Sequence, residues 1–462
     1  MNPNSKSKEM TRLLKRIFDE KKSEERFVPG KTFIHYAGDV IGYEEIASVI
    51  DSLLAGRLAA GGNVDTFEKL LSEYLKVRHV ATVNSGSTAD YLAFLGLKNP
   101  SLKEPLKPGD EVITCALSFS TAVSSITLNG LTPVFVDTNL GTYTMDSERV
   151  RDAVGKRTKA ILAVHLFGNP CNMDEIMRIA REHDLFVIED CCDALGSSIR
   201  DKQVGTFGDM GTFSFYPAHQ ITLMEGGAIS TNDQQLDYII RSLRMWGKAL
   251  PCPICGLNLS KSCRINHNKN IDSIKDYDLN YLFLNIGHNV RITEAQGAFG
   301  IQQLRRLDGF VEARKKNFDY IVRSLAPYEE LLVLPVSERN SSPSWYCVPL
   351  TIQPDAGFSR MELAEFLRES LIEFRYLFTG NILSQPAFRH IKRRIRGNLR
   401  KADLTSTNSL FLGCYPGITD AMREYVCERL AFFLDKKLNR NRSPSHSRRR
   451  ITARRISPVQ AS

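Results

Sequence analysis

Short runs of apolar and β-branched residues alternate with segments of helical periodicity over the first half of the chain. The seven runs expected to be strands are HVATV (79–83), EVITC (111–115), PVFVD (133–137), AILAVH (160–165), LFVIE (185–189), GTFSF (211–215) and GAIST (227–231). Helical patterns lie between them near 87–97, 120–129 and 174–183. Parallel strands joined by helices need cover on both faces, so the sequence predicts an α/β domain with a mainly parallel seven-stranded sheet.

The segments around this alternation predict the rest of the domain organisation. Residues 1–30 are polar and charged and are expected to form an N-terminal arm. The large α/β domain is expected over 31–310, with a cysteine-rich insertion at 248–285 that has no clear period. A long helix near 291–314 should leave this domain. Mixed strand and helix patterns then predict a smaller C-terminal α+β domain over 311–435.

The net charge of +9 comes from the C-terminal end of the 462-residue chain. Residues 436–462 hold nine Lys or Arg and no acid, which leaves 52 basic and 52 acidic residues in the remainder. This end has too little apolar content to pack, so it is predicted to be a disordered basic tail that binds polyanions only weakly. Specific nucleic-acid binding is not expected.

No stretch approaches the roughly 18 apolar residues that a spanning helix needs, and the N-terminus lacks the pattern of a secretory signal. We therefore expect a soluble, cytoplasmic protein with no membrane partner. Structural disulfides are rare in that compartment, yet the chain has ten cysteines, several of them grouped. Grouped thiols indicate metal or redox chemistry.

Two motifs follow expected strands. After 79–83, Gly86, Ser87 and Thr88 open a helix, where free backbone N–H groups favour a phosphate; a simple helix cap is the alternative. The run 185–189 ends in Glu189 and is followed by Asp190 and Asp193, and these carboxylates would lie at the carboxyl edge of the sheet, where ligands bind in open α/β folds. A carboxylate there could hold a protonated ring nitrogen of a pyridine cofactor, or could cap the next turn.

A third motif, GDMGTFSFYPAHQITLMEGGAIST, contains Ser214 and His219, and GHNVRITEAQGAFG follows at 287–300. In order and spacing, the four motifs together resemble the DegT/DnrJ/EryC1/StrS sugar aminotransferase family of pyridoxal-phosphate fold type I. The resemblance covers about residues 35–435. It implies a fold type I architecture, and a pyridoxal or pyridoxamine phosphate cofactor in the large domain.

The resemblance also assigns roles to residues. Asp190 would pair with the pyridine nitrogen, Phe119 would stack on the ring, and Ser214 would hold the phosphate. Asn289 would reach the phosphate of the neighbouring subunit, which implies a homodimer. The full set of implied cofactor-binding residues is Gly86, Ser87, Phe119, Asp190, Asp193, Ser214 and Asn289.

His219 stands where the family's aminotransferases have the lysine that binds the cofactor covalently. An imidazole cannot form that bond, but with an unperturbed pKa near ~6.5 it can move protons. The resemblance is to the histidine-bearing subset of the family. It implies a noncovalently held cofactor, His219 as the base at the cofactor's C4′ carbon, and C3 dehydration of a nucleotide-linked 4-keto-6-deoxyhexose. CDP-4-keto-6-deoxy-D-glucose is the expected substrate, in 3,6-dideoxyhexose and lipopolysaccharide O-antigen biosynthesis.

The same resemblance implies a [2Fe-2S] cluster that passes electrons from an NAD(P)H-dependent iron–sulfur flavoprotein reductase. Its ligands would be Cys192, Cys252, Cys255 and Cys263, separated by 59, 2 and 7 residues. The family pattern has one residue in the middle gap, so the match is imperfect, and Cys191 could replace Cys192. A structural zinc site is the alternative, because a CxxC pair with two further thiols also suits zinc.

Three other functions stay open at this point. A cluster-free 3-dehydratase of the family would regenerate its cofactor from glutamate and would leave the grouped cysteines without a role. A non-catalytic descendant would bind only a sugar nucleotide or an enzyme partner. Nucleic-acid binding would depend on the basic tail alone.

Overall fold

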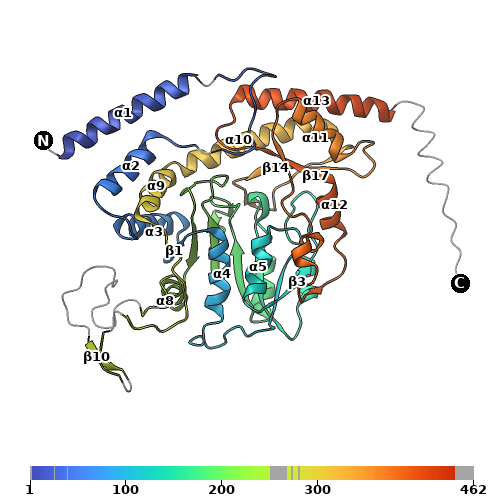
Figure 1. Cartoon of the computed structure of the whole chain (residues 1–462). Helices are drawn as coiled ribbons and strands as arrows, with labels where there is room; N and C mark the ends of the chain where they lie inside the picture. Colours follow the sequence, from blue (N-terminus) through green and yellow to red (C-terminus); the bar gives the residue numbers. More distant parts are fainter. Residues whose placement is uncertain are drawn as a thin grey trace, which may run out of the picture.

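The computed structural model describes residues 3–24, 26–38, 40–249, 268–271, 274–278 and 281–442. Its centre is an eight-stranded sheet in the order β1-β9-β8-β5-β4-β2-β3-β16 (Figure 1). The strands are β1 (His79–Val83), β2 (Glu111–Cys115), β3 (Thr132–Val136), β4 (Thr158–Val164), β5 (Phe186–Asp190), β8 (Met210–Ser214), β9 (Gly227–Thr231) and β16 (Arg394–Ile395). All seven predicted strands are therefore present in one sheet.

Two features of the sheet differ from a simple parallel arrangement. Strand β9 is antiparallel to both β1 and β8, whereas the β8-β5-β4-β2-β3 series is parallel. An eighth strand, β16, pairs in parallel with β3 and comes from the C-terminal part of the chain. The sequence missed β16 because two residues, one of them an arginine, carry no strand pattern.

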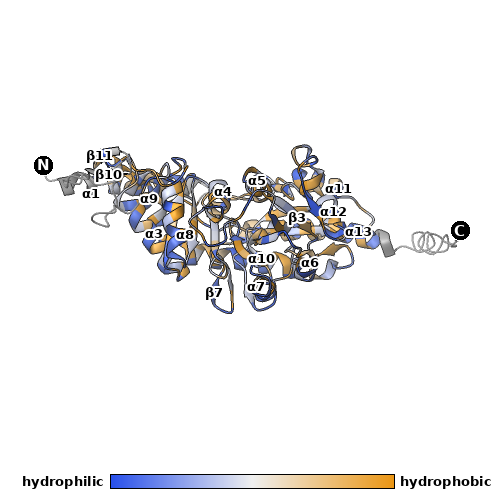
Figure 2. Ribbon diagram, turned by 90° about the horizontal axis from the view of Figure 1, so that it is seen from below, coloured by the Kyte–Doolittle hydropathy of each residue, from blue (hydrophilic) through white to orange (hydrophobic). Residues whose placement is uncertain are grey.

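Helices cover both faces of the sheet, as its almost fully buried strands require. Helices α4 and α5 lie on one side, and α6 and α7 on the other (Figures 1 and 2). Helices α2, α3 and α9 pack together at the β1 end. In Figure 2, α3 and α8 show both polar and apolar turns, as helices with one face on the core do. The ranges are α2 (Tyr43–Leu54), α3 (Gly62–Leu75), α4 (Gly86–Leu97), α5 (Ser120–Leu128), α6 (Ser147–Ala153), α7 (Met173–Glu182), α8 (Gln234–Leu243) and α9 (Glu294–Arg305).

The long helix expected near 291–314 is two helices. Helix α9 ends with Arg306 as its C-cap, and α10 (Leu307–Leu325) starts at the next residue. The early part of α10 packs in the large-domain core through Phe310 and Val311. Its later part, with Phe318, packs in the core of the C-terminal domain. Helix α10 therefore joins the two cores.

The C-terminal domain is built on a four-stranded antiparallel sheet in the order β12-β14-β17-β15. Helices α10 and α13 pack against each other, and α11 packs on α13 and β17. The ranges are β12 (Leu332–Val333), β14 (Cys347–Ile352), β15 (Phe374–Tyr376), β17 (Ser409–Gly413), α11 (Arg360–Glu369), α12 (Arg400–Asn408) and α13 (Asp420–Arg442). This is the α+β arrangement that the sequence predicts.

Helix α13 extends into the segment predicted to be a disordered tail, so that prediction is wrong for residues 436–442. The ammonium of Lys436 lies 4.0 Å from the ring centroid of Phe432. Lys437 pairs with Glu362 at 2.5 Å, and Leu438 packs against the core of the domain. The side chains of this helical turn therefore have partners, which a composition argument cannot reveal. Residues 443–462 lie outside the described residues.

The N-terminal arm contains helix α1 (Pro3–Glu24), which packs against α2. The insertion contributes the antiparallel strands β10 (Asn268–Ile271) and β11 (Ile274–Asp278), but Cys252, Cys255 and Cys263 lie outside the described residues. Further short elements among the described residues are β6 (Ser198–Ile199), β7 (Lys202–Gln203), β13 (Ser341–Ser342), and 3₁₀ helices at Leu166–Gly168, Ala326–Tyr328, Ile382–Ser384 and Pro386–Phe388.

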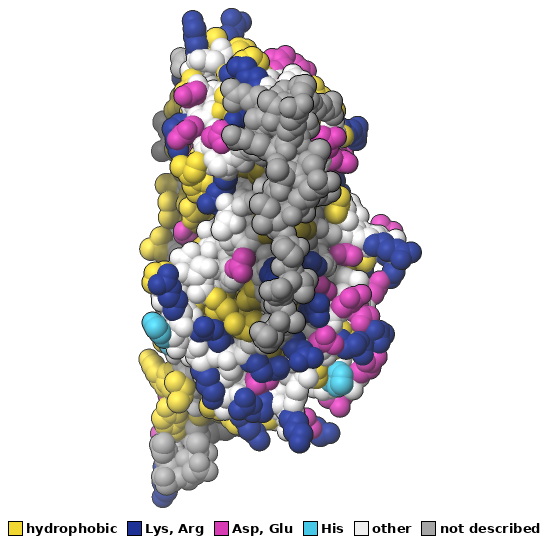
Figure 3. Space-filling view, turned by 90° about the vertical axis from the view of Figure 1, so that its right-hand side faces the viewer, with side chains coloured by type: hydrophobic (Ala, Val, Ile, Leu, Met, Phe, Trp, Pro, Cys, Tyr) yellow, Lys and Arg dark blue, Asp and Glu magenta, His cyan; other side chains and the backbone are white. Residues whose placement is uncertain are grey.

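Charges on the surface are mixed. On the face shown in Figure 3, Lys and Arg side chains lie among Asp and Glu, with the basic groups more numerous in the lower half. This matches the balanced charge of residues 1–435. Within the described parts of the chain, no helix is both long and apolar enough to cross a membrane.

A buried ion-pair network fixes β1, the strand that leads into the first predicted motif. The carboxylate of Glu68 on α3 lies 2.8 Å from Arg241 and 2.5 Å from Arg244, and it accepts the backbone N–H of Thr82 at 2.9 Å. Burial alone would raise the pKa of Glu68, but the two arginine charges bring it down to about 2. The network therefore depends on an ionised carboxylate.

Replacing Glu68 by Gln should lower the free energy of unfolding by about 3 kcal/mol, because the partly buried guanidinium of Arg244 loses its counter-charge and Arg241 is left with Asp237 alone. Urea denaturation monitored by circular dichroism measures this change. The difference between wild type and variant should shrink as the pH falls from 4.5 toward 2, since a lowered pKa stabilises the fold only while the carboxylate is ionised.

The matched control is Glu73→Gln on the same helix, where the carboxylate is 58% exposed and pairs only with Lys69. This variant should stay within about 0.5 kcal/mol of wild type. Equal effects of the two substitutions would contradict the role given to Glu68.

Candidate active site

The turn that begins α4 has backbone N–H groups at the start of a helix. Ser85 is the helix cap, and its Oγ accepts the backbone N–H of Thr88 at 3.1 Å. Gly86 is the first helical residue, and Ser87 beside it is exposed. The cap is thus supplied by Ser85, which leaves the hydroxyl of Ser87 and the first N–H groups of α4 for a ligand.

Two glycines allow this turn to lie directly on β8 and β9. A Cβ atom on Gly86 would come within 2.5 Å of Ser214 Cβ and 3.0 Å of Cys192 Sγ. A Cβ on Gly227 would come within 2.3 Å of the carbonyl oxygen of Ser85. Side chains cannot occupy these positions, so the close packing brings Gly86, Ser214 and Cys192 together.

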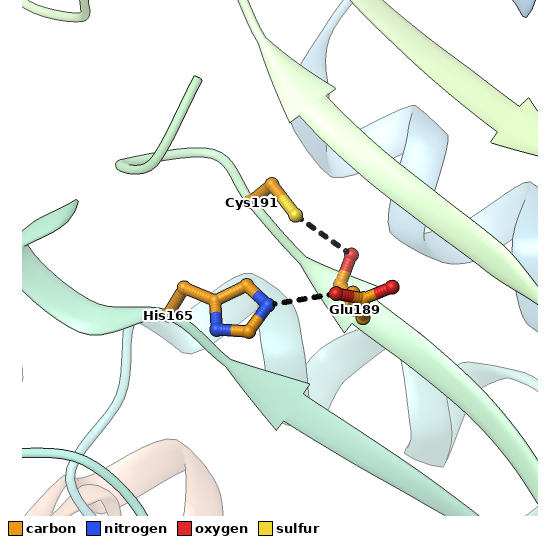
Figure 4. Close-up of side chains that lie close together, drawn as sticks. All are labelled: His165, Glu189 and Cys191. Carbon is orange, nitrogen blue, oxygen red and sulfur yellow. Dashed lines mark hydrogen bonds and ion pairs between the residues drawn. The ribbon is translucent and has the colours of Figure 1, made fainter. Parts of the chain in front are cut away.

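The carboxylate of Glu189, next to Asp190, is buried and takes part in hydrogen bonds within the fold (Figure 4). It accepts hydrogen bonds from His165 Nε2 and from the backbone N–H groups of Gly205, Phe207 and Gly208 at 2.7–3.1 Å. His165 Nδ1 accepts the N–H of Cys171 at 2.9 Å, so the ring proton is on Nε2. Neither nitrogen keeps a lone pair for a metal, and the His165, Glu189 and Cys191 group is structural.

Asp190 ends β5 beside a second carboxylate that the sequence analysis did not single out. Asp90, on α4, is fully buried, and its Oδ1 accepts the hydroxyl of Thr212 at 2.6 Å. Burial raises the pKa of Asp90, and the charge of Asp190 raises it further. Asp190 Oδ1 accepts the backbone N–H of Cys192 at 3.0 Å. Burial raises the pKa of Asp190 as well, but the hydrogen bonds from Cys192 lower it, so Asp90 is the carboxyl group of the pair that holds its proton more strongly.

Asp193 and His219 face each other, 3.5 Å apart between Oδ1 and Nδ1. Asp193 Oδ2 also accepts the backbone N–H of Phe167 at 3.1 Å. Burial, with the charge of Asp190, raises the pKa of Asp193 to about 7. The structure thus places Asp193 beside the imidazole of His219.

His219 lies in the loop that follows β8, and its side chain is 14% exposed. The ring is next to Tyr346, with 5.4 Å between centroids, and to Tyr216 at 6.2 Å. Burial lowers its pKa to about 3, and the nearby charge of Arg314 adds to this effect. The imidazole is therefore neutral at physiological pH and can accept a proton.

The other predicted residues occupy the edge of the same region. Phe119 immediately precedes α5, is 51% exposed, and contacts Phe378 edge-on at 5.9 Å between centroids. Asn289 is exposed, and its Oδ1 accepts a hydrogen bond from Arg291. The next residue, Val290, accepts the N–H of Asn84, so this segment runs beside the turn that leads into α4.

Sequence reasoning missed three residues of the site. They are Asp90, Arg314 and Tyr346. Asp90 had a usable signal, since an acid in the apolar helical run STADYLAFLGL needs an explanation. Arg314 and Tyr346 had none, because they come from α10 and from the start of β14 and reach His219 only in the folded chain.

The described residues fit a pyridine cofactor with a phosphate. The α4 turn has N–H donors at its start, Gly86 lets this turn lie against Ser214 and Cys192, and the carboxyl group of Asp190 suits a protonated ring nitrogen. The fold and these residues define the class: this is a pyridoxal-phosphate fold type I protein. The chain belongs to the DegT/DnrJ/EryC1/StrS aminotransferase family, whose model matches residues 39–431.

Named relatives lie within this family. The chain is 41% identical over 436 residues to the lipopolysaccharide biosynthesis protein RfbH of Salmonella typhimurium, covering 94% of this chain and 99% of that protein. It is 41% identical over 429 residues to dTDP-4-dehydro-2,6-dideoxy-D-glucose 3-dehydratase of Saccharopolyspora spinosa, covering 92% of each. A solved structure of E. coli GDP-4-keto-6-deoxy-D-mannose-3-dehydratase with bound hydrated PLP is 32% identical, with a TM-score of 0.77, and covers 86% of this chain and 100% of that one.

Replacing Gly86 by Ala should weaken binding of pyridoxal phosphate by tenfold or more, about 1.4 kcal/mol, because the new methyl group would enter the contact with Ser214. An absorbance titration with the cofactor measures the dissociation constant. Gly62→Ala is the control, since Gly62 is also the first residue of a helix but has nothing within 4 Å of its Cβ position. Equal binding of the cofactor by wild type and the Gly86 variant would contradict the role given to Gly86.

Proposed function

We propose that this protein is a 3-dehydratase that removes the C3 hydroxyl of a nucleotide-linked 4-keto-6-deoxyhexose with His219 as base. The observation that carries the proposal is the buried His219, which faces Asp193 and has a pKa lowered to about 3, so that its imidazole is neutral. The sequence resemblance implies that this histidine stands where the family's aminotransferases have their lysine. Relatives that are named 3-dehydratases support it. When bound, pyridoxamine phosphate supplies an electron sink and an amine that condenses with the sugar ketone.

The residues around His219 suit proton transfer. Nδ1 faces Asp193, so Nε2 is the nitrogen left to take a proton from the cofactor's C4′ carbon. Once protonated, the imidazole can donate from Nδ1 to the Asp193 carboxylate, which stabilises the added charge. Asp190 would hold the ring nitrogen of the cofactor, and Ser87, Ser214 and the α4 turn would hold its phosphate.

Replacing His219 by Asn should lower the dehydration rate by about 10²-fold or more, because a positioned base is lost, while the dissociation constant for the cofactor changes little. Loss of the sugar substrate followed by mass spectrometry measures the rate. His183→Asn, at the end of α7, is the control and should keep full activity. Full activity of the His219 variant would refute the proposal and favour a non-catalytic sugar-nucleotide-binding protein.

The substrate proposed first is CDP-4-keto-6-deoxy-D-glucose, in 3,6-dideoxyhexose and lipopolysaccharide O-antigen biosynthesis. Similarity to the lipopolysaccharide biosynthesis protein RfbH supports this choice. The named 3-dehydratases act on dTDP- and GDP-linked sugars, so those nucleotides belong in the same assay. Turnover of the CDP sugar in preference to the other two is the expected result.

We also propose a [2Fe-2S] cluster, with an NAD(P)H-dependent iron–sulfur flavoprotein reductase as its electron donor. Of the four proposed ligands, Cys192 is described: its backbone N–H donates to Asp190, and its thiol lies beside Gly86. Cys191 is instead fully buried beside Glu189, so Cys192 is the better candidate. The spacing of Cys252, Cys255 and Cys263 supports the remainder of the set.

Protein purified without oxygen should contain about two irons and two sulfides per chain and should lose visible absorption on reduction with dithionite. Cys255→Ser should lose the iron, whereas Cys171→Ser, in the large-domain core, should keep it. One bound zinc per chain, or no metal, would refute the proposed [2Fe-2S] cluster. Such a result would favour a dehydratase regenerated from glutamate, for which the relative solved with a trapped PLP-glutamate geminal diamine is a precedent.

The proposed assembly is a homodimer in which Asn289 serves the partner's site. Its side chain is exposed, which leaves it accessible to a second chain. Mixing inactive His219→Asn chains with inactive Asn289→Ala chains should restore about a quarter of wild-type activity, since half of the dimers are hybrids with one intact site. No recovery in verified hybrid dimers would place Asn289 in the site of its own chain.

A further inference from the structure

The side chain of Arg314, on α10, is buried behind the site, with only 2% exposed. Its Nη2 donates to the backbone carbonyls of His219 at 2.8 Å and Ala218 at 3.4 Å. Its Nη1 donates to the carbonyls of Tyr346 at 3.1 Å and Trp345 at 3.3 Å. One guanidinium group therefore binds four backbone carbonyls.

These carbonyls belong to two segments far apart in the sequence. One is the loop after β8 that carries His219, and the other leads into β14 of the C-terminal domain and carries Tyr346. The rings of these two residues lie 5.4 Å apart. The planar guanidinium has its donors in fixed directions, so it sets the relative position of both segments.

The charge of Arg314 has no close carboxylate partner among the described residues, whose ion pairs within 4.0 Å do not include it. The groups that face the imidazole of His219 are Asp193, Tyr346, Tyr216 and Arg314. Arg314 is the one cation in this set. Its charge also lowers the pKa of Asp193, and a buried positive charge opposes the arrival of a second positive charge next to it.

We propose that Arg314 is the positioning residue of the catalytic base: its guanidinium joins the His219 loop to the C-terminal domain and places a positive charge behind the imidazole. The positioning role of Arg314 rests on the proposed function, because the proposed function makes His219 the base. The geometric part, a clamp between two segments, does not depend on any reaction.

The test compares Arg314→Gln, which removes the charge and most of the donors, with Arg314→Lys, which keeps the charge on a different donor geometry. Modification of His219 by diethyl pyrocarbonate, followed by peptide mass spectrometry across pH, reports when the imidazole becomes protonated. Hydrogen–deuterium exchange of residues 215–222 reports how firmly the loop is held. Neither readout needs substrate or cofactor.

In Arg314→Gln, the midpoint pH for protonation of His219 should rise by about one unit or more, because a nearby positive charge is gone. In Arg314→Lys the midpoint should stay near that of wild type, while exchange of residues 215–222 should increase. In both variants kcat should fall by about tenfold or more with little change in KM, since the base is displaced after substrate is bound.

Arg423→Gln is the matched control, because Arg423 is also buried, at 4% exposed, but binds Asn317 and Asp420 instead of the His219 loop. It should leave the His219 titration unchanged. An unchanged midpoint in a folded Arg314→Gln protein would overturn the proposal. If that variant does not fold, unchanged exchange in Arg314→Lys would overturn it. If wild-type protein has no dehydratase activity but Arg314→Gln shows the predicted midpoint shift, the proposed function is refuted. The structural role of Arg314 between the two segments is then still supported.

Discussion

The hydrogen bonds of Glu189 are the constraint on which the site depends. Three backbone N–H groups and His165 converge on this one buried carboxylate, and they hold the chain between β5 and β8 around the end of β5. Asp190 is the next residue, and its own carbonyl accepts the N–H of His165. Because neighbouring residues of a strand point to opposite faces, anchoring Glu189 on one side presents Asp190 on the other. The same anchor determines where Cys192 and Asp193 emerge from the strand.

The electrostatics of the site follow from its burial. Three carboxyl groups and one guanidinium share a poorly solvated region, and each has a different state. Burial, and then the charge of Asp190, hold the pKa of Asp90 well above its ordinary value. Asp193 has a pKa raised to about 7, near the range in which proton transfer to or from His219 is useful. The neutral imidazole thus lies between a carboxyl group that can stabilise its protonated form and an arginine that opposes it.

Much of this could be predicted from sequence because it depends on local patterns. The seven strands were identified by β-branched runs, and the Gly86 turn and Asp190 by their position directly after strands. The strand β16, the break at Arg306 and the helical residues 436–442 were not predicted, because each depends on distant partners. Arg394 in β16, for example, pairs with Glu111 on β2 at 2.8 Å.

Resemblance to the family, and not periodicity, supports a phosphate site at Gly86 and His219 in place of a lysine. The sequence by itself determined the mainly parallel sheet and the residue types near the ends of its strands, which are a glycine turn, a carboxylate and a histidine. These features are set by periodicity and by single residue identities, which are readable along one dimension. Only the tertiary structure decided the protonation states of the site and revealed the three site residues that the sequence patterns missed. Asp90, Arg314 and Tyr346 act on Asp190 or His219 through burial and contact between α4, α10, β14 and the two strand ends. A pKa and a hydrogen-bond distance depend on which groups meet in space, and that is settled when the chain folds.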